Sequence, residues 1–183
     1  MSNTMSRIRF ATAREVFEAF PTANEDISTP PSDAPPLDYL RTLSAGPTPD
    51  DAISFCAYLL PRREAVWWAG QCVRDLIAQP SQHDEIGLRV AADWVEVPEE
   101  QRRRAALNYA LNANQKLAST WVAFAAAWSG GAMILHEHAA PPAPPHLTAK
   151  AARAAVMLAL AGKVDRAAQI AQCVERAVYV AEN

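Results

Sequence analysis

The sequence predicts an all-α protein, a single-domain helical bundle of about seven to nine helices with two proline-rich loops. No segment alternates apolar and polar residues between turn signals, which is the pattern of a half-buried strand. Glycine is scarce at 6 residues, whereas the 14 prolines gather largely in two clusters, Pro21–Pro36 and Pro141–Pro145. Elsewhere apolar residues recur every three or four positions, the spacing that a helix buries along one side. Because proline lacks a backbone donor, each cluster is expected to be an extended loop.

The chain of 183 residues is long enough for one domain with an apolar core and short for two. Half of its residues are hydrophobic, which provides enough burial for folding without disulfides. We therefore expect a flexible N-terminal tail over residues 1–11 and one helical domain over residues 12–183. Within that domain, the proline-rich loops are expected at residues 21–36 and 139–147.

Composition and charge exclude several classes of protein. A net charge of −3 and a pI near 5.8 lack the basic surplus of a nucleic-acid-binding protein. The N-terminus has no apolar run behind its charges, and the longest apolar run, residues 154–161, is far below the ~20 residues of a bilayer span. The three cysteines lack CxxC spacing, as in proteins of a reducing compartment. We expect a cytoplasmic protein that binds neither nucleic acid nor membrane.

Capping residues and prolines predict where the first helices begin and end. Thr12 and Glu15 fit a capping box, in which two side chains bind free backbone N–H groups of the first turn. Thr48 and Pro49 supply a cap and a first-turn proline for another helix. Pro61 ends that helix and opens the next.

The same signals continue through the middle of the chain. Pro80 closes the helix after Pro61, Ser81 with Asp84 starts another, and Pro98 is a further first-turn proline. A later helix ends at Ser129–Gly131. It is predicted to bury a stripe at offsets of three and four, consisting of Leu117, Trp121, Phe124, Ala125 and Trp128.

Two helices follow the second proline-rich loop. The first, capped by Thr148, is apolar nearly all round from Ala154, so we expect it in a central position. Gly162 supplies the turn to the last helix, and the two form an alanine-rich hairpin. The face that the last helix is expected to bury consists of Ala167, Ile170, Ala171, Val174, Val178 and Ala181.

Two adjacent tryptophans, Trp67 and Trp68, raise a question of burial. Adjacent residues on a helix point ~100° apart, so the two indoles cannot share a face. Trp67 lies in line with Arg63, Gln71 and Arg74 on the polar side, where a large aromatic side chain needs a cover. Trp68 belongs to the inward stripe, which consists of Ala65, Trp68, Ala69, Cys72 and Leu76.

Three kinds of cover for Trp67 are open: another part of the chain, an arginine stacked on its ring, or a partner protein. Another part of the chain can lie over it, and our specific hypothesis is the loop Pro141–Pro145, because proline-rich segments favour aromatic platforms. A partner protein can also cover the indole, since Trp and Arg dominate interfaces energetically. The surface expected to bind a partner consists of Arg62, Arg63, Trp67, Gln71, Arg74, Pro141, Pro142, Pro144 and Pro145.

The segment LHEHAAPPAPPH contains Glu137 and three histidines, His136, His138 and His146. Two histidines separated by one residue share a side of an extended chain, and three nitrogens would suit zinc. No fourth ligand is set by spacing. We therefore expect no metal site and no cofactor, and an exposed or capping role for these histidines.

The charged pairs indicate stabilised helix ends. Asp50–Asp51, Asp84–Glu85 and Glu99–Glu100 fall in first turns, where the helix dipole favours negative charge. Arg102–Arg104 follow the last pair by one turn and are expected on a solvated face. The sequence has no phosphate-binding glycine loop and no GxSxG elbow, and no Cys/His pair can be placed. We expect a protein that is not an enzyme.

Two stretches, LPRREAVWWAGQCVR (Leu60–Arg74) and PPAPPHLTAKAARAAVMLA (Pro141–Ala159), together resemble a family of small, uncharacterised helical proteins of Proteobacteria. The family is catalogued as a domain of unknown function and is met around type VI secretion and other contact-dependent gene clusters. The likeness covers most of the chain. It carries no catalytic role to any residue, and the HEH segment is not part of the pattern.

The resemblance implies a non-catalytic cytoplasmic accessory protein of a type VI-like secretion system. It would be an adaptor or chaperone-like module that binds a partner protein such as an effector. Three alternatives stay open. The first is an immunity protein that neutralises a toxin, although the chain is only mildly acidic. The second is a metal-dependent enzyme that uses His136, His138 and His146. The third is a homodimerisation module, since alanine-rich helices often pair between subunits.

Overall fold

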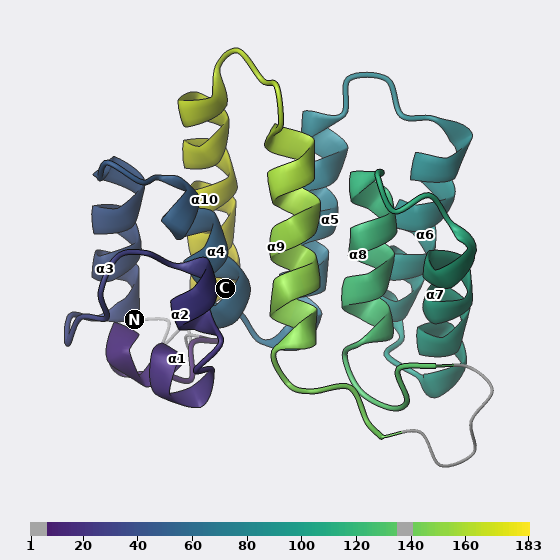
Figure 1. Ribbon diagram of the computed structural model, residues 1–183, viewed down its shortest axis with the longest axis horizontal. Coiled ribbons are helices and arrows are strands. Elements are labelled where there is room, and N and C mark those ends of the chain that lie inside the picture. Colours follow the sequence, from purple (N-terminus) through teal and green to yellow (C-terminus); the bar gives the residue numbers. More distant parts are fainter. Residues whose placement is uncertain (1–6, 135–140) are drawn as a thin grey trace. The chain divides into compact units, whose positions relative to one another are not determined.

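The computed structural model describes residues 7–134 and 141–183, and the regular elements there are all helices (Figure 1). The all-α prediction is confirmed. The described residues form more helices than expected because the four-residue α2 lies inside the first proline cluster. The helices are α1 (Ala13–Ala19), α2 (Ala23–Asp26), α3 (Pro36–Ala45), α4 (Asp50–Leu59), α5 (Arg62–Leu76), α6 (Gln82–Glu96), α7 (Glu100–Asn112), α8 (Ala118–Ala127), α9 (Leu147–Leu160) and α10 (Arg166–Glu182).

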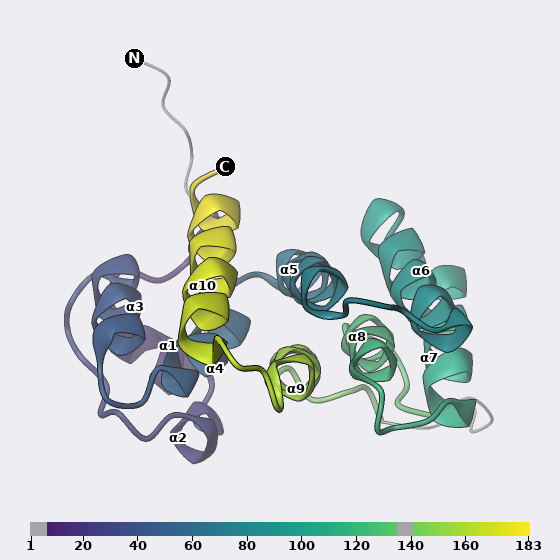
Figure 2. The ribbon, with the colours of Figure 1, turned by 90° about the horizontal axis from the view of Figure 1, so that it is seen from above.

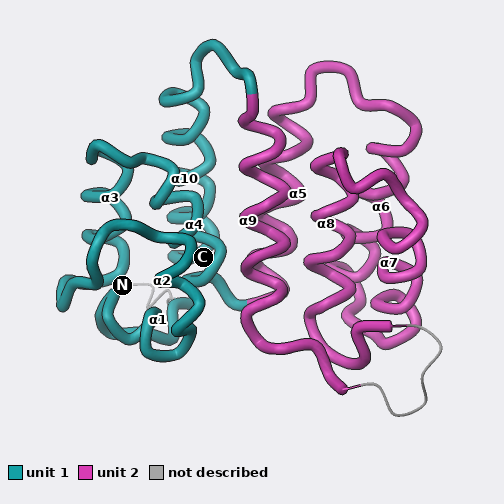
Figure 3. Tube along the Cα trace, viewed as in Figure 1, with its two compact units in different colours: residues 1–61, 162–183 teal, residues 62–161 magenta. Residues whose placement is uncertain are grey.

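The chain forms two compact units (Figure 3). Unit 1 combines residues 1–61 with residues 162–183, and unit 2 is residues 62–161. One border follows Pro61, which precedes α5. The other is Gly162, whose φ of 71° lies in the left-handed region that favours glycine. The predicted alanine-rich hairpin is therefore divided, because α9 belongs to unit 2 and α10 to unit 1.

In unit 1, α4 forms the centre of the core. It contacts α2, α3 and α10, and its residues from Asp51 to Leu59 are all buried. The ring of Phe55 lies 4.9 Å from that of Tyr39 on α3 and 6.2 Å from that of Phe17 on α1, measured between centroids. Burial of apolar side chains such as these is the dominant favourable term in folding.

The first proline-rich segment is held by side chains of α3 and α4. Asp51 accepts a hydrogen bond from the backbone N–H of Thr29, and the Tyr39 hydroxyl donates to the carbonyl oxygen of the same residue. The prediction of an extended loop over residues 21–36 is wrong at two points. Helix α2 occupies its first part, and Pro36 is already the first residue of α3, a position that suits proline's fixed φ.

The buried face of α10 is rotated from the predicted one. Ala167 is exposed, and Ala171 and Val178 are only partly buried. Because α10 contacts both α3 and α4, the residues that face these two helices decide its burial. The observed buried face consists of Ile170, Cys173, Val174, Ala177, Val180 and Ala181.

In unit 2, α8 is the central helix. It contacts α5, α6, α7 and α9, and Figure 2 shows it among them. Neighbours on every side bury each of its residues except Trp121. The predicted stripe is therefore wrong at Leu117, Trp121 and Trp128, which are partly exposed. Small alanine side chains let the neighbouring helices approach α8 closely. The central position expected for α9 belongs to α8, and Leu158 of α9 is 40% exposed.

Most predicted helix starts are confirmed. Ser81 and Asp84 form a capping box at the start of α6. The Thr12 hydroxyl oxygen accepts the backbone N–H of Glu15, but the Glu15 carboxylate accepts from Ala11 at 2.7 Å and not from Thr12. The prolines mark boundaries but lie just before the helices and not in their first turns, since α4 and α5 each begin one residue after a proline and α7 two residues after one. Thr48 does not supply the predicted cap, because α4 has no side-chain cap bond.

The start of α9 and the N-terminal tail depart from expectation. Helix α9 begins at Leu147, so the second proline-rich loop ends one residue earlier than predicted. The Thr148 hydroxyl does not cap this helix; it donates to the carbonyl oxygen of Trp128 at 3.1 Å. Of the expected tail, residues 7–11 are described. The backbone N–H of Arg7 donates to the carbonyl oxygen of Ala181, so this part is attached to α10.

The three cysteines all lie within the described residues, and each is buried and forms no disulfide. Burial raises the pKa of the Cys56 thiol well above its ordinary value, which keeps it protonated and unreactive. Over residues 7–134 and 141–183, no helix combines the length and the apolar character that crossing a membrane requires.

Candidate partner-binding site

Helix α5 separates its two tryptophans as the helical geometry requires. Trp68 is fully buried, and its neighbours on the same stripe are buried as well, which confirms the predicted inward face. Trp67 is only partly buried, and Gln71 shares that state one turn further on. Arg63 and Arg74 on the same side are exposed. The aromatic side chain therefore interrupts an otherwise polar face.

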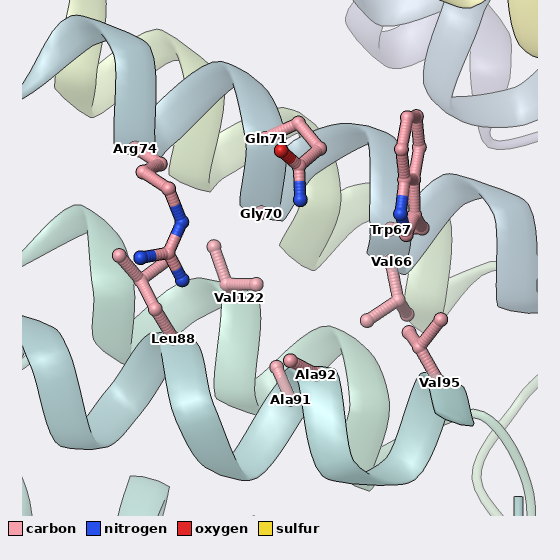
Figure 4. A pocket seen from close by; sticks show the side chains of 10 residues that line it. All are labelled: Val66, Trp67, Gly70, Gln71, Arg74, Leu88, Ala91, Ala92, Val95 and Val122. Atoms are coloured by element: carbon pink, nitrogen blue, oxygen red, sulfur yellow. The ribbon is translucent and has the colours of Figure 1, made fainter. Parts of the chain in front are cut away.

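A small pocket lies beside Trp67, between α5 and α6. Its volume of about 20 Å³ holds roughly one water molecule. Figure 4 shows the side chains of Gln71 and Arg74 reaching from α5 toward α6, over a floor of aliphatic groups. The lining residues are Val66, Trp67, Gly70, Gln71 and Arg74 of α5, Leu88, Ala91, Ala92 and Val95 of α6, and Val122 of α8.

Gly70 contributes no side chain to this pocket. A Cβ atom at Gly70 would lie 3.6 Å from Cγ1 of Val122, an ordinary van der Waals distance. A side chain at this position would therefore extend into the pocket beside Val122. Helix interiors disfavour glycine by about 1 kcal/mol relative to alanine, so this position gives up stability.

Two of the predicted site arginines donate hydrogen bonds to backbone carbonyl oxygens at or just beyond a helix end. The Arg63 guanidinium donates to the carbonyl oxygens of Val95 (2.6 Å) and Glu96 (3.3 Å), the last residues of α6. Arg62 donates to the carbonyl oxygen of Ser129 at 2.6 Å, just beyond α8. The last carbonyl groups of a helix have no partner within it, so the Arg63 bonds stabilise the end of α6, whereas the Arg62 bond holds the turn that follows α8. Both arginines therefore have a role in the scaffold of unit 2.

The described part of the second proline-rich loop lies beside the end of α8. The backbone N–H of Ala143 donates to the carbonyl oxygen of Gly131 at 2.8 Å, and Pro142 forms an isolated bridge with Ala132. All residues that line the Trp67 pocket come from α5, α6 and α8. Pro141, Pro142, Pro144 and Pro145 do not line this pocket, and their position across the Trp67 ring stays a prediction.

Arg103 is a buried residue that sequence reasoning assigned to a solvated face. It is 4% exposed, and its guanidinium forms a bidentate pair with Glu100, with both distances 2.7 Å. It also donates to the carbonyl oxygens of Ala127 (2.6 Å) and Ala132 (3.1 Å). The prediction is wrong for Arg103 because the end of α8 and the chain that follows it cover the guanidinium. Arg103 lies three, four and seven residues before Ala106, Leu107 and Ala110, the other buried residues of α7, and this helical spacing is the signal that could have found it.

Asp51 and Asp84 are buried carboxylates that the sequence marked only as first-turn residues. Asp51 accepts hydrogen bonds from Ser28, Thr29 and Thr48. Burial alone would raise the pKa of Asp51, but the hydrogen bonds from Thr29 and Ser28 outweigh it and hold the pKa below its usual value. Protein donors surround this carboxylate, so its role is to hold the preceding segment.

Asp84 has the same environment in unit 2. Its carboxylate accepts from the Ser81 hydroxyl at 2.6 Å and from the Ser119 hydroxyl at 2.7 Å. Burial opposes ionisation here too, yet the hydrogen bonds from Ser81 and Ser119 keep the pKa of Asp84 below its usual value. The hydrogen bond between Asp84 and Ser119 links the first turn of α6 to the buried helix α8.

The candidate metal ligands fall largely outside the described part of the chain. His136, Glu137 and His138 lie outside the described residues. His146 directly precedes α9 and makes no side-chain cap bond there. Over residues 7–134 and 141–183, no group of three or more His, Cys, Asp or Glu side chains could hold a metal ion.

The chain was compared with known proteins after its geometry was established. The profile of one family, described as "Family of unknown function (DUF6931)", matches residues 39–181. The match includes residues of both units and begins within α3. No curated protein and no solved structure matches the chain.

Proposed function

The chain belongs to the family of unknown function DUF6931, and from that premise we propose that it is a non-catalytic accessory protein that binds a partner protein. The observation that carries the proposal is the partly exposed Trp67 beside exposed Arg74, above the pocket that Gly70 leaves open. We further propose that the protein serves a type VI-like secretion system in the cytoplasm, as an adaptor or chaperone-like module. The motif pairs around Leu60–Arg74 and Pro141–Ala159 support this setting by resemblance.

The chemistry of the site favours a small apolar side chain next to an acidic group. The floor is aliphatic, and the pocket admits about one water molecule, so it suits a side-chain group the size of a methyl. The Arg74 guanidinium at the rim can bind a carboxylate in bidentate fashion. Trp67 offers a ring that a partner can cover, and Trp and Arg are enriched among the residues that carry most interface energy.

Two variants test the site. Arg74→Glu reverses the charge at the rim, and Gly70→Ala places a methyl group in the pocket at a distance that Val122 tolerates. Alanine also favours the helix, so we expect Gly70→Ala to keep or raise the melting temperature while it lowers partner binding. Arg104→Glu, an exposed charge reversal on α7, is the matched control.

The measurement is affinity purification of the tagged full-length chain from its native host, followed by identification of the bound proteins. We expect the wild type and Arg104→Glu to recover the same partner, and Arg74→Glu and Gly70→Ala to recover much less of it. Equal recovery by all four proteins would reject the α5 site. A wild-type sample without any secretion component would reject the secretion role.

A gene deletion separates the adaptor from an immunity protein. Loss of an adaptor abolishes secretion of the partner but leaves the cells healthy. Loss of an immunity protein causes intoxication by neighbouring sibling cells. Intoxication with intact secretion would overturn the adaptor proposal.

A further inference from the structure

Unit 1 carries a shallow groove between α3 and α10, with a volume of about 420 Å³. All of its residues belong to unit 1, so it shares none with the α5 pocket. The walls are Arg41, Ser44 and Ala45 of α3 and Ala171, Val174, Glu175 and Val178 of α10.

The groove explains why the predicted face of α10 and the observed one differ. Ala171 and Val178 were expected in the core, yet both are only partly buried and line this groove. The small side chains of Ala45 and Ala171 leave the space between the two helices unfilled. The apolar pattern of α10 therefore extends beyond what unit 1 covers, which is typical of a helix with a second contact.

The two walls carry opposite charges. Arg41 stands on the α3 wall, where its side chain is 59% exposed and bonds Asp38 of the same helix at 2.8 Å. Glu175 stands on the α10 wall and is exposed. A groove with a cation on one wall and an anion on the other is complementary to a copy of itself. A partner of uniform charge would meet a like charge on one wall.

An exposed aromatic residue lies on α10, one turn beyond the groove residue Glu175. Tyr179 follows Glu175 by one turn of α10 and is 64% exposed. A tyrosine ring needs a concave apolar surface to be covered, and the alanine-lined groove beside it provides such a surface. The same helix thus carries both a projecting ring and one wall of a groove.

From these observations we propose that the α3–α10 groove is the interface of a two-fold dimer, in which a second copy of this chain covers the first. In a two-fold interface the same patch serves both subunits, so if residue i contacts residue j, then j contacts i. Arg41 of each copy faces Glu175 of the other, and the Tyr179 ring packs against the alanines of the opposite groove.

The two-fold pairing predicts that two charge-reversal variants dimerise poorly alone but form a heterodimer when mixed. A two-fold dimer has two such contacts, each between position 41 of one copy and position 175 of the other. In the Arg41→Glu variant a carboxylate faces a carboxylate at both contacts, and in the Glu175→Arg variant a guanidinium group faces a guanidinium group at both. Each variant alone should lose dimer affinity by about tenfold or more. In a mixture of the two variants both contacts become attractive, so a heterodimer should form.

The experiment is light scattering and sedimentation of the full-length chain over a concentration series. We expect a dimer for the wild type, monomers for each single variant, and recovery of the dimer in the equimolar mixture. Glu18→Arg, an exposed charge reversal on α1, is the matched control and should dimerise as the wild type does. Thermal unfolding of each variant checks that the exposed substitutions leave the fold intact.

Several results would overturn the dimer. One is a wild-type monomer throughout the concentration series. Another is a dimer that the single variants leave unchanged, or two monomeric variants that do not associate when mixed. If a charge variant fails to fold, Tyr179→Ala takes its place: it removes only an exposed ring, and an unaltered dimer would reject the interface. None of these outcomes depends on the α5 pocket.

Discussion

At the scale of single residues, Asp51 connects two distant segments of unit 1. Its carboxylate accepts both hydroxyl and backbone donors from Ser28 and Thr29, more than twenty positions earlier in the chain. A buried donor that loses its acceptor costs more than the bond itself contributed, because water cannot replace the acceptor. Asp51 therefore anchors the first proline-rich segment to α4.

Substitution of Asp51 by alanine tests this anchor. We expect Asp51→Ala to lower the free energy of unfolding by about 1–3 kcal/mol, because buried donors lose their acceptor. Protease cleavage between α2 and α3 should also accelerate. The control is Asp33→Ala: Asp33 pairs with Arg14 in exposed positions, so its removal should change stability little. Chemical denaturation measures both variants, and equal stabilities would contradict the anchor.

Arg103 is the residue at which the predicted solvated face of α7 is wrong. Its sequence neighbours Arg102 and Arg104 are chemically identical, and the helical pattern of α7 is weakly amphipathic. What buries Arg103 is the end of α8 and the chain that follows it, because Arg103 binds the carbonyl oxygens of Ala127 and Ala132. Gly131 lies so close to the guanidinium that a Cβ atom there would be 2.7 Å from it.

At the scale of elements, α5 is the helix whose two faces were predicted correctly. The inward stripe, the outward Trp67 and the start after Pro61 all depend on interactions within the helix or next to it. Helices α8 and α10 were predicted less well. Their burial depends on how many neighbours surround each helix, and the sequence of one helix does not contain that number.

The tryptophan pair on α5 gives a test with a built-in control. Trp68→Ala should cost about 3–5 kcal/mol, because it removes a fully buried indole from a close-packed core. Trp67→Ala should cost clearly less, since that indole is already partly exposed. Thermal and chemical unfolding of the two variants measure the difference. Equal losses would show that Trp67 is as deeply packed as its neighbour.

At the scale of the whole molecule, hydrogen-bonded carboxylates make stability depend on acid pH. Asp51 and Asp84 in different units, and Glu100 beside Arg103, all have pKa values below their ordinary ones. At acid pH the unfolded chain therefore binds more protons than the folded chain. This contribution to stability is fully present above the unfolded pKa values, about 4. It is lost as the pH falls through the lower folded values.

We expect the melting temperature to fall steeply below about pH 4 and to vary little just above it. Asp84→Asn removes one of the titrating groups, so its stability should depend less on pH in the acid range. Calorimetry of the wild type and this variant from neutral to acid pH makes the comparison. Parallel curves would show that Asp84 does not contribute to the acid transition.

The sequence by itself determined the helical class, most helix boundaries, the free thiols and the two faces of α5. These features follow from proline sterics, capping bonds and the 3.6-residue period, which act over a few positions of the chain. Only the tertiary structure decided the division into two units, the backbone partners of Arg103, the burial of α8, the pocket at Gly70 and the groove beside α10. Each of these depends on side chains brought together from distant positions, and the periodicity of one segment does not determine which other segments will pack against it.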